Sequence, residues 1–210
     1  MDITLEKAGK RFNRDWIFRN FSFEFISGGK YAITGPNGSG KSTLLQVLAG
    51  SMNTTEGSIA WLENDKKINP ENVYRYISIV APYLELIEEM TAKEFLEFHA
   101  VFKKLILPAD EILNIIGLAK TTGKQIRNFS SGMRQRVKLA QAIFSDVPCL
   151  FLDEPCTNLD TAGYELYHQL IAKYCQDKLV VVSSNDMNEY DFCDTRINVM
   201  DYKIKAAPVQ

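Results

Sequence analysis

Short runs of apolar residues, separated by longer segments with helical periodicity, make up most of this 210-residue chain. Fully apolar runs of four or five residues are typical of strands that are buried on both faces of a parallel sheet. Segments with apolar residues at every third or fourth position are typical of amphipathic helices. Because such strands and helices alternate, the pattern predicts an α/β fold with a largely parallel sheet. The predicted strands are residues 30–34, 76–80, 149–152, 179–183 and 196–200, and the predicted helices are 43–49, 132–144, 161–175 and 186–193.

The first 25 residues follow a different, alternating pattern. Ile3 and Leu5 begin one strand, and residues 16–25 form a second strand with three phenylalanines on one face. The polar residues 9–15 predict a turn region between these two strands. We therefore expect an N-terminal antiparallel β layer that precedes the parallel core.

After residue 81, the apolar residues follow a helical spacing and no longer a strand pattern. Thr91, followed three residues later by Glu94, is the pattern of a capping box at the start of a helix. An apolar stripe continues this helix, and Pro108 precedes a second helix that is rich in isoleucine and leucine. The sequence therefore predicts a helical insertion subdomain over about residues 82–131, between two strands of the core.

Composition and charge narrow the class of protein. A net charge of −2 and a hydrophobic content of 46% predict a single globular domain over residues 1–210 and give no argument for a nucleic-acid partner. The chain lacks a run of about 18 apolar residues, and its N-terminus lacks the basic start and apolar stretch of a signal peptide. Its four scattered cysteines argue against a disulfide framework or a zinc site, and the protein is expected to be cytoplasmic.

Residues 35–43 have the spacing of a phosphate-binding loop: a glycine, four residues, and then Gly-Lys-Ser. A predicted strand precedes this loop and a predicted helix follows it, which favours phosphate binding over an incidental glycine-rich turn. Lys41 would reach the β- and γ-phosphates of a nucleotide, and the Ser42 hydroxyl would bind Mg²⁺. Backbone N–H groups and the helix N-terminus would complete an anion site. The predicted nucleotide-binding residues of this loop are Gly35, Pro36, Asn37, Gly38, Ser39, Gly40, Lys41, Ser42 and Thr43.

The apolar strand at residues 149–152 ends in two adjacent carboxylates, Asp153 and Glu154. Because α/β proteins bind ligands at the carboxyl ends of strands, these acids match the Walker B position of a nucleotide-hydrolysing site. Asp153 would hold Mg²⁺ through water, and Glu154 would orient and polarise the attacking water. Two acids after a strand are by themselves ordinary surface residues, so the phosphate loop earlier in the chain is what favours the catalytic interpretation.

A Ser-x-Gly segment lies just upstream of this strand, where residues 129–133 read Phe-Ser-Ser-Gly-Met. The order of phosphate loop, helical insertion, Ser-x-Gly segment and Walker B acids resembles the ATP-binding subunits of ABC transporters over essentially the whole chain. In that family the segment usually reads Leu-Ser-Gly-Gly-Gln, so Ser130 and Gly132 match it, whereas Ser131 and Met133 depart from it. The resemblance implies a P-loop NTPase fold and an ATPase that uses ATP and Mg²⁺. The local alternative is that Ser130 or Ser131 is an ordinary helix N-cap.

The same resemblance implies two partners. In the family, residues at the positions of Ser130 and Gly132 bind the γ-phosphate of ATP held by a second ATP-binding subunit, so a dimer is expected, with a homodimer favoured over a heterodimer. An integral membrane permease subunit that docks beside residues 83–91 would keep this peripheral subunit at the inner face of the cell membrane, and the short chain is similar to small exporter-type subunits. The apolar residues there suit such docking, and core packing explains them equally well: Tyr83, Leu84, Leu86 and Ile87.

The resemblance also assigns two further residues. Phe12 falls where the family places an aromatic ring that stacks on adenine. Trp16 is a second candidate for the stacking ring. The alternative is that Phe12 is an ordinary aromatic residue of the core or of a turn. Asp160 matches an aspartate of the loop that crosses the dimer interface.

Two residues that the family usually carries are replaced. Pro82 stands where a glutamine contacts Mg²⁺, and proline has neither an amide side chain nor an N–H donor. Asn185 stands where a histidine contacts the γ-phosphate, and asparagine donates a hydrogen bond but carries no charge. Losing one transition-state hydrogen bond typically lowers a rate about 10²- to 10³-fold. We expect either a slow ATPase, with Glu154, Lys41 and Asn185 as its catalytic residues, or a regulatory nucleotide clamp.

Other classes of protein also contain a phosphate loop. Soluble ABC proteins of repair, chromosome organisation or translation usually carry long heptad insertions or two such domains, and the sequence shows neither. A kinase or GTPase does not explain the Ser-x-Gly segment, and the guanine-reading Asn-Lys-x-Asp motif is missing. A nucleotide-binding module of a larger cytosolic assembly is a third alternative.

Overall fold

The computed structural model of the protein describes residues 1–121 and 123–203. Its strands are β1 (Asp2–Phe12), β2 (Asp15–Phe25), β3 (Lys30–Thr34), β4 (Glu56–Glu63), β5 (Lys66–Lys67), β6 (Ile77–Val80), β7 (Cys149–Asp153), β8 (Leu179–Ser183) and β9 (Thr195–Asn198). Its α-helices are α1 (Lys41–Leu48), α2 (Ala92–Phe102), α3 (Ala109–Ile115), α4 (Ser131–Ile143) and α5 (Thr161–Tyr174). Short 3₁₀ helices are η1 (Pro70–Arg75), η2 (Ala119–Thr121), η3 (Ile126–Asn128), η4 (Met187–Glu189) and η5 (Val199–Tyr202). Among the described residues, no helix has both the length and the apolar sequence that crossing a membrane requires.

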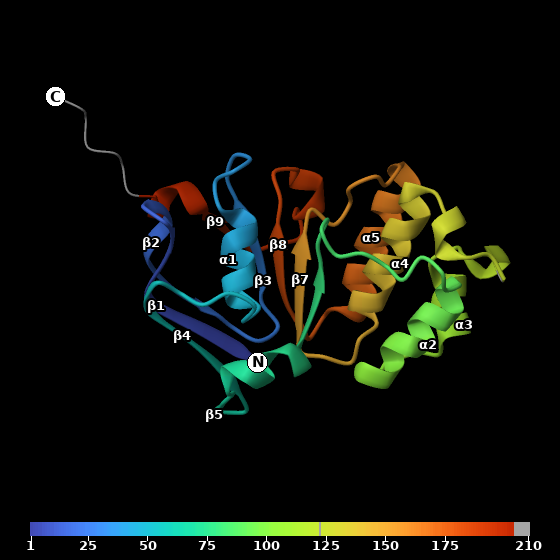
Figure 1. Cartoon of the computed structure of the whole chain (residues 1–210), viewed down its shortest axis with the longest axis horizontal. Helices are drawn as coiled ribbons and strands as arrows, with labels where there is room; N and C mark the ends of the chain where they lie inside the picture. The colour runs from blue at the N-terminus through green and yellow to red at the C-terminus, as the bar shows by residue number, and fades with distance from the viewer. Residues whose placement is uncertain (122, 204–210) are drawn as a thin grey trace.

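Two β-sheets and a group of helices form the molecule (Figure 1). The antiparallel sheet has the strand order β2-β1-β4-β5, and the core sheet has the order β6-β7-β8-β3-β9. Every neighbouring pair of strands in the core sheet is parallel. The predicted α/β fold, with its N-terminal antiparallel layer and its parallel core sheet, is confirmed.

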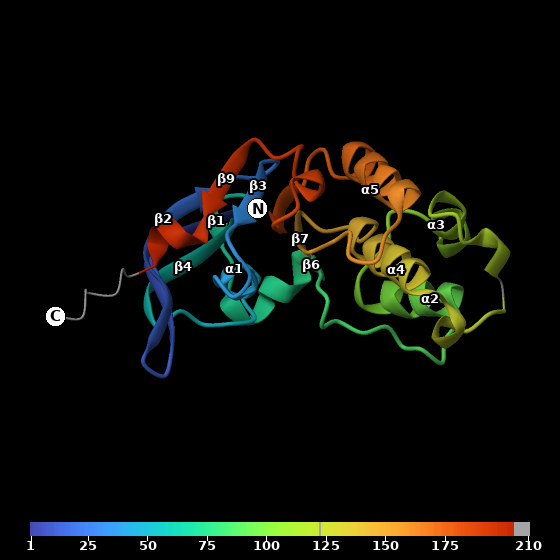
Figure 2. The same cartoon turned by 90° about the horizontal axis from the view of Figure 1, so that it is seen from above.

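The parallel sheet is buried on both faces, and each face has its own core. Leu150 and Leu152 of β7 pack with α4, α5 and the helical insertion, whereas Cys149 and Phe151 pack with α1 and the antiparallel sheet. Figure 2 shows the core strands between these two groups of elements. Full burial of one large apolar side chain contributes about 1.5–3 kcal/mol, which explains why β7 is apolar at successive positions.

The first hairpin is longer than its sequence pattern predicts. The turn predicted at residues 9–15 is wrong for most of its length, because β1 pairs with β2 as far as Phe12, opposite Asp15. Only residues 13 and 14 turn the chain, and Asn13 takes the left-handed φ of 52° that asparagine tolerates. The hairpin therefore carries Phe12 to its tip.

The end of the chain also differs from its sequence pattern. The helix predicted over residues 186–193 is a single 3₁₀ turn, which Asp186 caps by accepting from Asn188 N at 3.0 Å. The strand predicted over residues 196–200 ends at Asn198, whose Oδ1 accepts from Met200 N at 3.0 Å and begins η5. In both places a capping side chain ends the longer element that the apolar pattern predicts.

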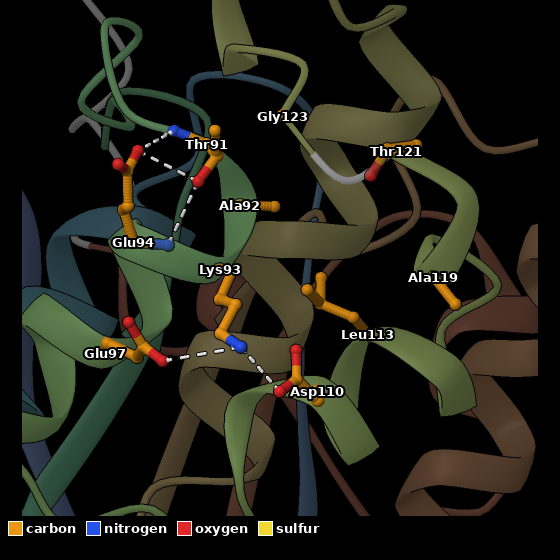
Figure 3. Close-up of a pocket in the computed structure, with 10 residues that line it drawn as sticks. All are labelled: Thr91, Ala92, Lys93, Glu94, Glu97, Asp110, Leu113, Ala119, Thr121 and Gly123. Carbon is orange, nitrogen blue, oxygen red and sulfur yellow. Dashed lines mark hydrogen bonds and ion pairs between the residues drawn. The ribbon is translucent and has the colours of Figure 1, made fainter.

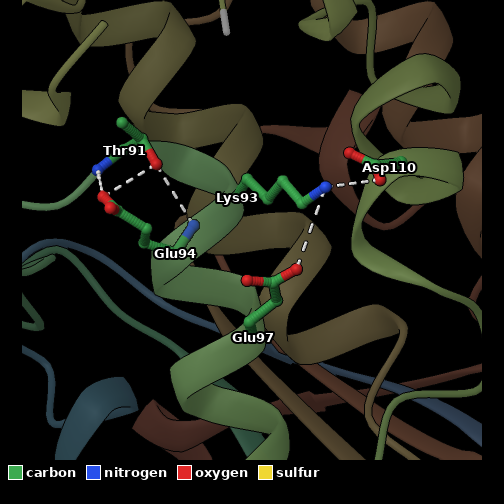
Figure 4. Close-up of polar contacts among 5 residues, drawn as sticks. All are labelled: Thr91, Lys93, Glu94, Glu97 and Asp110. Carbon is green, nitrogen blue, oxygen red and sulfur yellow. Dashed lines mark hydrogen bonds and ion pairs between the residues drawn. The ribbon is translucent and has the colours of Figure 1, made fainter. Parts of the chain in front are cut away.

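Helix α2 begins at the predicted capping box, which is confirmed (Figure 4). Thr91 Oγ1 accepts from Glu94 N at 3.2 Å, and Thr91 N donates to Glu94 Oε2 at 2.8 Å. One face of the same helix meets α3, where Lys93 Nζ pairs with the Asp110 carboxylate at 2.6 Å. An exposed ion pair of this kind contributes at most about 1 kcal/mol, so the apolar residues between the helices provide most of the stability.

Candidate nucleotide-binding and hydrolysis site

Loops from four neighbouring strands meet at the carboxyl edge of the parallel sheet. In the order β6-β7-β8-β3, each strand is followed by a segment that holds a predicted site residue. Ser183 of β8 lies opposite Ile33 of β3 and opposite Asp153 of β7, so the ends of these three strands lie side by side. The phosphate loop, the Walker B acids and Asn185 therefore lie along one edge of the sheet, where α/β proteins bind their ligands.

The phosphate loop adopts a backbone conformation that depends on its glycines. Gly40, directly before α1, has a φ of 108°, and a side chain at this position would collide with Ile17 of β2. Gly35 has a φ of 142°, and a Cβ atom there would lie 2.8 Å from Ser39 Oγ. Because other residues are excluded at these two positions, the backbone can approach a phosphate group closely.

The Lys41 side chain already lies against the phosphate loop. Only 6% of this residue is exposed, and its Nζ donates to Gly35 O at 2.8 Å and to Pro36 O at 3.5 Å. An incoming phosphate would replace these neutral carbonyl acceptors by anionic oxygens, so that both partners of each hydrogen bond carry charge. Ser42 follows in the first turn of α1 and is partly exposed.

Asp153 is a buried carboxylate with an unfilled acceptor. It is 4% exposed, and its Oδ1 has no hydrogen-bond partner among the described residues. A buried charged oxygen without a partner is costly. Mg²⁺ prefers carboxylate, hydroxyl and water oxygens, so Asp153 and Ser42 fit the metal that the sequence predicts.

Glu154 is exposed at the start of the loop that follows β7 and has a left-handed φ of 47°. Its N–H donates to Ser183 O at 2.9 Å, and its carbonyl oxygen accepts from Thr157 Oγ1 at 2.9 Å. A positive φ is unusual for a residue with a long side chain and is found most often where the surrounding structure imposes it. The loop therefore holds the Glu154 carboxylate on the surface, at the edge where the phosphate loop also lies.

Asn185 bonds directly to the phosphate loop. Its Nδ2 donates to Asn37 Oδ1 at 2.7 Å, although 148 residues separate the two in sequence. Pro82 follows β6, at the outer end of this row of strands, where it is exposed and lines a cavity of about 380 Å³ together with Ser131 and Asn158. The structure thus brings Asn185 to the predicted nucleotide site and places Pro82 beside the start of α4.

Ser130 and Gly132 mark the start of α4. Ser130 is the N-cap of this helix, because its Oγ accepts from Met133 N at 3.3 Å, and it is exposed. In both views α4 lies in the half of the molecule that holds the helical insertion, whereas α1 lies in the other half, with β7 between them (Figures 1 and 2). Within one chain, the Ser-x-Gly segment therefore lies apart from the phosphate loop.

Phe12 and Trp16 lie on the first hairpin and differ in what covers their rings. Phe12 is 45% exposed, and Lys10 Nζ lies 5.2 Å from its ring centroid. Trp16 is partly buried, with the guanidinium carbons of Arg11 and Arg19 at 5.2 Å and 4.6 Å from its ring centroid. Because two guanidinium groups already contact the indole, Phe12 has the more accessible ring for stacking on a base.

A cavity of about 440 Å³ lies in the helical insertion (Figure 3). Its walls come from the start of α2, from α3, from η2 and from Gly123, and it contains no predicted site residue. Lys93 Nζ lies 2.6 Å from the Asp110 carboxylate and 3.9 Å from the Glu97 carboxylate, so these charged groups pair with one another. This cavity is separate from the site at the sheet edge.

Two buried polar residues beside the site were missed by the sequence patterns. Gln135 of α4 is 8% exposed and donates from Nε2 to Pro155 O at 2.5 Å. Glu189 of η4 is 3% exposed and accepts from Cys156 N at 2.7 Å. Both hold the loop that follows Glu154. A polar residue in a helical pattern gives no local signal of whether it faces solvent or a neighbouring loop, so nothing in the sequence identifies this role.

Comparison with known proteins places this geometry in a family. Residues 18–157 match the family model described as "ABC transporter". The chain is 30% identical, over 95% of its length, to the daunorubicin resistance ATP-binding protein DrrA3 of Streptomyces coeruleorubidus, and it covers 65% of that protein. It is 32% identical, over 84% of its length, to the cytochrome c biogenesis ATP-binding export protein CcmA of Cupriavidus pinatubonensis, and it covers 77% of that protein. The solved structure of MJ0796, a bacterial ABC transporter cassette in dimeric form, matches with a TM-score of 0.78 and 25% identity, and 94% of each chain is covered.

The chain belongs to the family of ABC transporter ATP-binding proteins, and it is an ATPase domain of the ABC class. The family and the P-loop NTPase fold that the sequence predicts are both confirmed. Since the chain spans 65% of the length of the daunorubicin relative, this membership describes the ATP-binding domain and leaves the transported substrate open.

Proposed function

We propose that this chain is a single ABC-type domain that hydrolyses ATP to power transport through a separate membrane subunit. The observation that carries the proposal is the set of residues at one sheet edge: Lys41 held at the phosphate loop, Asp153 buried with an unfilled acceptor, and Glu154 exposed beside them. Two relatives support the transport part, because one is named for daunorubicin resistance and the other as an export protein.

Each residue of the site has its own task in hydrolysis. Backbone N–H groups of the phosphate loop bind the β- and γ-phosphates, and Lys41 moves its ammonium from Gly35 O to phosphate oxygens. Ser42 and Asp153 would hold Mg²⁺, which would supply positive charge to offset the charge that builds on the phosphate oxygens. Glu154 accepts a hydrogen bond from a water molecule and orients it for attack on the γ-phosphorus.

A second ATP-binding subunit closes the site. At the exposed start of α4, the Ser130 hydroxyl, the Gly132 N–H and the helix N-terminus form an anion site. In a two-fold symmetric dimer, this segment of one copy covers the phosphate loop of the other. A homodimer then contains two complete sites, since each copy carries both halves. The dimeric form of the MJ0796 cassette supports this arrangement.

Hydrolysis is expected to be slow. Pro82 supplies no donor to the phosphates, and the Asn185 amide is engaged with Asn37 at 2.7 Å. Asn185 can donate to the γ-phosphate only after this contact breaks, and each lost transition-state hydrogen bond typically lowers the rate about 10²- to 10³-fold. The same contact favours a second candidate function, a regulatory clamp that binds ATP and dimerises without appreciable turnover.

Substitution of Glu154 by glutamine tests these two functions. A slow ATPase predicts measurable wild-type turnover that falls about 10²-fold or more in Glu154→Gln, because the residue that orients the water is lost. ATP should also trap the variant as a dimer in size-exclusion chromatography. The matched control is Glu165→Gln, at an exposed carboxylate of α5, which should keep the wild-type rate.

Two other results of this assay would contradict a slow ATPase in which Glu154 orients the water. Measurable and equal rates in the wild type and Glu154→Gln would show that Glu154 does not orient the water. ATP-dependent dimerisation of the wild type without turnover would favour the clamp.

A membrane partner would have an apolar groove available on this chain. A cavity of about 520 Å³ lies between the end of α1, η1 and the segment after β6, and Tyr74, Tyr83 and Leu84 line it. Tyr74 is 57% exposed and Tyr83 is 52% exposed, whereas Leu86 is 8% exposed and packs in the core. The two interpretations of residues 83–87 therefore apply to different residues, with Tyr83 and Leu84 suited to docking and Leu86 to packing.

A short helix of an integral membrane permease subunit that docks in this groove would hold the chain at the inner face of the cell membrane. We expect a tagged chain to co-purify with an integral membrane protein from a detergent-solubilised membrane fraction, and Tyr83→Ser to weaken this association. Ile26→Ser is the matched control, because Ile26 is equally exposed but lies after β2 in the antiparallel layer. Recovery of the wild-type chain from the soluble fraction alone would favour a soluble, non-transport ABC ATPase.

A further inference from the structure

Glu189 is a buried carboxylate for which the proposed hydrolysis has no task. It belongs to η4, after β8, and is 3% exposed, and Asp153 is the other acidic residue buried to this degree in the described part of the chain. A buried carboxylate is costly unless donors compensate for its desolvation. The contacts of Glu189 therefore indicate what it does.

The Glu189 carboxylate binds the loop that carries Glu154. Its Oε1 accepts from Cys156 N at 2.7 Å, two residues after Glu154. Burial raises the pKa of Glu189, while the Ser184 hydroxyl and the Cys156 N–H lower it. A hydrogen bond from a backbone N–H to a carboxylate is charge-assisted and is stronger than one to a neutral acceptor.

The loop between Glu154 and Thr157 is tightly constrained. Thr157 donates to Glu154 O from both its N–H, at 3.2 Å, and its Oγ1, at 2.9 Å. Gln135 Nε2 donates to Pro155 O at 2.5 Å, and Glu189 holds the next residue, Cys156. Because the loop is this short, a displacement of Cys156 is transmitted to the backbone of Glu154.

The turn that carries Glu189 is itself held by α5. Tyr167 Oη donates to Glu189 O at 2.8 Å, and Tyr164 Oη donates to Asp186 Oδ2 at 2.9 Å. Asp186 directly follows Asn185. Glu189 therefore connects the loop of Glu154 with the segment of Asn185 through one turn that is anchored to a helix.

We propose that Glu189 is a positioning residue for hydrolysis, which holds residues 154–157 so that Glu154 is aimed at the attacking water and ties this loop to the segment of Asn185. The inference rests on the proposed ATP hydrolysis. Glu189 acts through the backbone of Cys156, whose N–H its Oε1 binds. Misplacing a catalytic group by about 1 Å can lower a rate about 10²-fold, so an anchor two residues from Glu154 has a measurable effect.

Three variants of the full chain test this role. Glu189→Ala removes the acceptor, whereas Glu189→Gln keeps a carbonyl oxygen that can accept from Cys156 N. Glu165→Ala, at an exposed carboxylate of α5, is the matched control. The measurements are kcat and KM for ATP in the presence of Mg²⁺, and amide hydrogen exchange of peptides that cover residues 154–160 and 35–43.

Glu189→Ala should lower kcat about 10²-fold and leave KM within about twofold of the wild type. Hydrogen exchange should increase in residues 154–160 and stay unchanged in the phosphate loop, because only the first segment loses its anchor. Glu189→Gln should recover kcat to within about fivefold of the wild type and restore protection of residues 154–160, because the hydrogen bond to Cys156 N is kept. Glu165→Ala should match the wild type.

Two outcomes would overturn the role of Glu189. Unchanged exchange of residues 154–160 in Glu189→Ala would mean that the carboxylate does not hold the loop. Loss of ATP binding and of protection throughout the chain in both Glu189 variants would mean that the residue only stabilises the fold. Failure of the proposed function is recognised separately, because the wild type itself would then hydrolyse no ATP while hydrogen exchange still reports on the anchor.

Discussion

The phosphate loop differs from the segments that follow β6 and β8 in how its residues are brought together. In the phosphate loop the parts are local, since Lys41 donates to the carbonyl of Gly35, six residues earlier, and glycines at positive φ shape the backbone. The segments after β6 and β8 instead hold Pro82 and Asn185, and Asn185 meets the phosphate loop only across 148 residues of sequence.

This difference indicates that binding and cleavage of ATP depend on separate parts of the chain. The residues proposed to hold phosphate match the phosphate-loop spacing, whereas Pro82 and Asn185 replace the residues that would support the transition state. Binding should therefore be ordinary for this family and cleavage slow, because interactions made only in the transition state set the rate of the chemical step. Three sets of substitutions challenge or refine this comparison.

The largest effect is expected from Lys41→Ala, which removes a charge from the local, complete part of the site. ATP turnover should fall at least about 10²-fold and nucleotide affinity should weaken, because the charge-assisted bonds to phosphate are lost. Isothermal titration calorimetry and a phosphate-release assay would measure both, with Lys66→Ala at the exposed strand β5 as the control. Full turnover and intact ATP affinity in Lys41→Ala would contradict the assignment of the phosphate loop.

A gain of activity is expected when positions 185 and 82 are given the histidine and glutamine that the family usually carries. Asn185→His, alone and together with Pro82→Gln, should raise kcat by up to about 10²-fold, because histidine supplies a donor that can carry positive charge and glutamine supplies the amide that proline lacks. Nucleotide affinity should change less than kcat, and Asn72→His at an exposed position of η1 should change neither. Unchanged kcat in the double variant would show that these two positions do not limit hydrolysis.

The smallest effect is expected from removing the aromatic ring that would stack on the adenine base. Phe12→Ala should raise the Kd for ATP about tenfold, because stacking of a base on an aromatic ring contributes about 1–3 kcal/mol. Trp16→Ala should change this Kd much less, since the guanidinium groups of Arg11 and Arg19 already contact the indole. Fluorescence titration with a nucleotide analogue would compare the two, and a larger effect of Trp16→Ala would reverse the assignment of the stacking ring.

Sequence patterns predicted the elements that a local spacing of residues defines. The capping box at Thr91 and the α/β alternation are found in the structure, because side-chain spacing and apolar period define each of them. The patterns were wrong where a distant or capping contact decides the backbone. Pairing of β1 with β2 extends the first hairpin to Phe12, and the Asn198 side chain ends β9.

By itself, the sequence determined the motifs, their order and the family that this order defines, because each motif is a local spacing of residues with defined chemistry. Only the tertiary structure decided which residues from different loops meet. Asn185 bonds to Asn37 and Glu189 bonds to Cys156 because the strand order β7-β8-β3 places the ends of those strands side by side. Such contacts depend on strand order and burial, and neither leaves a periodic or spacing pattern in the chain.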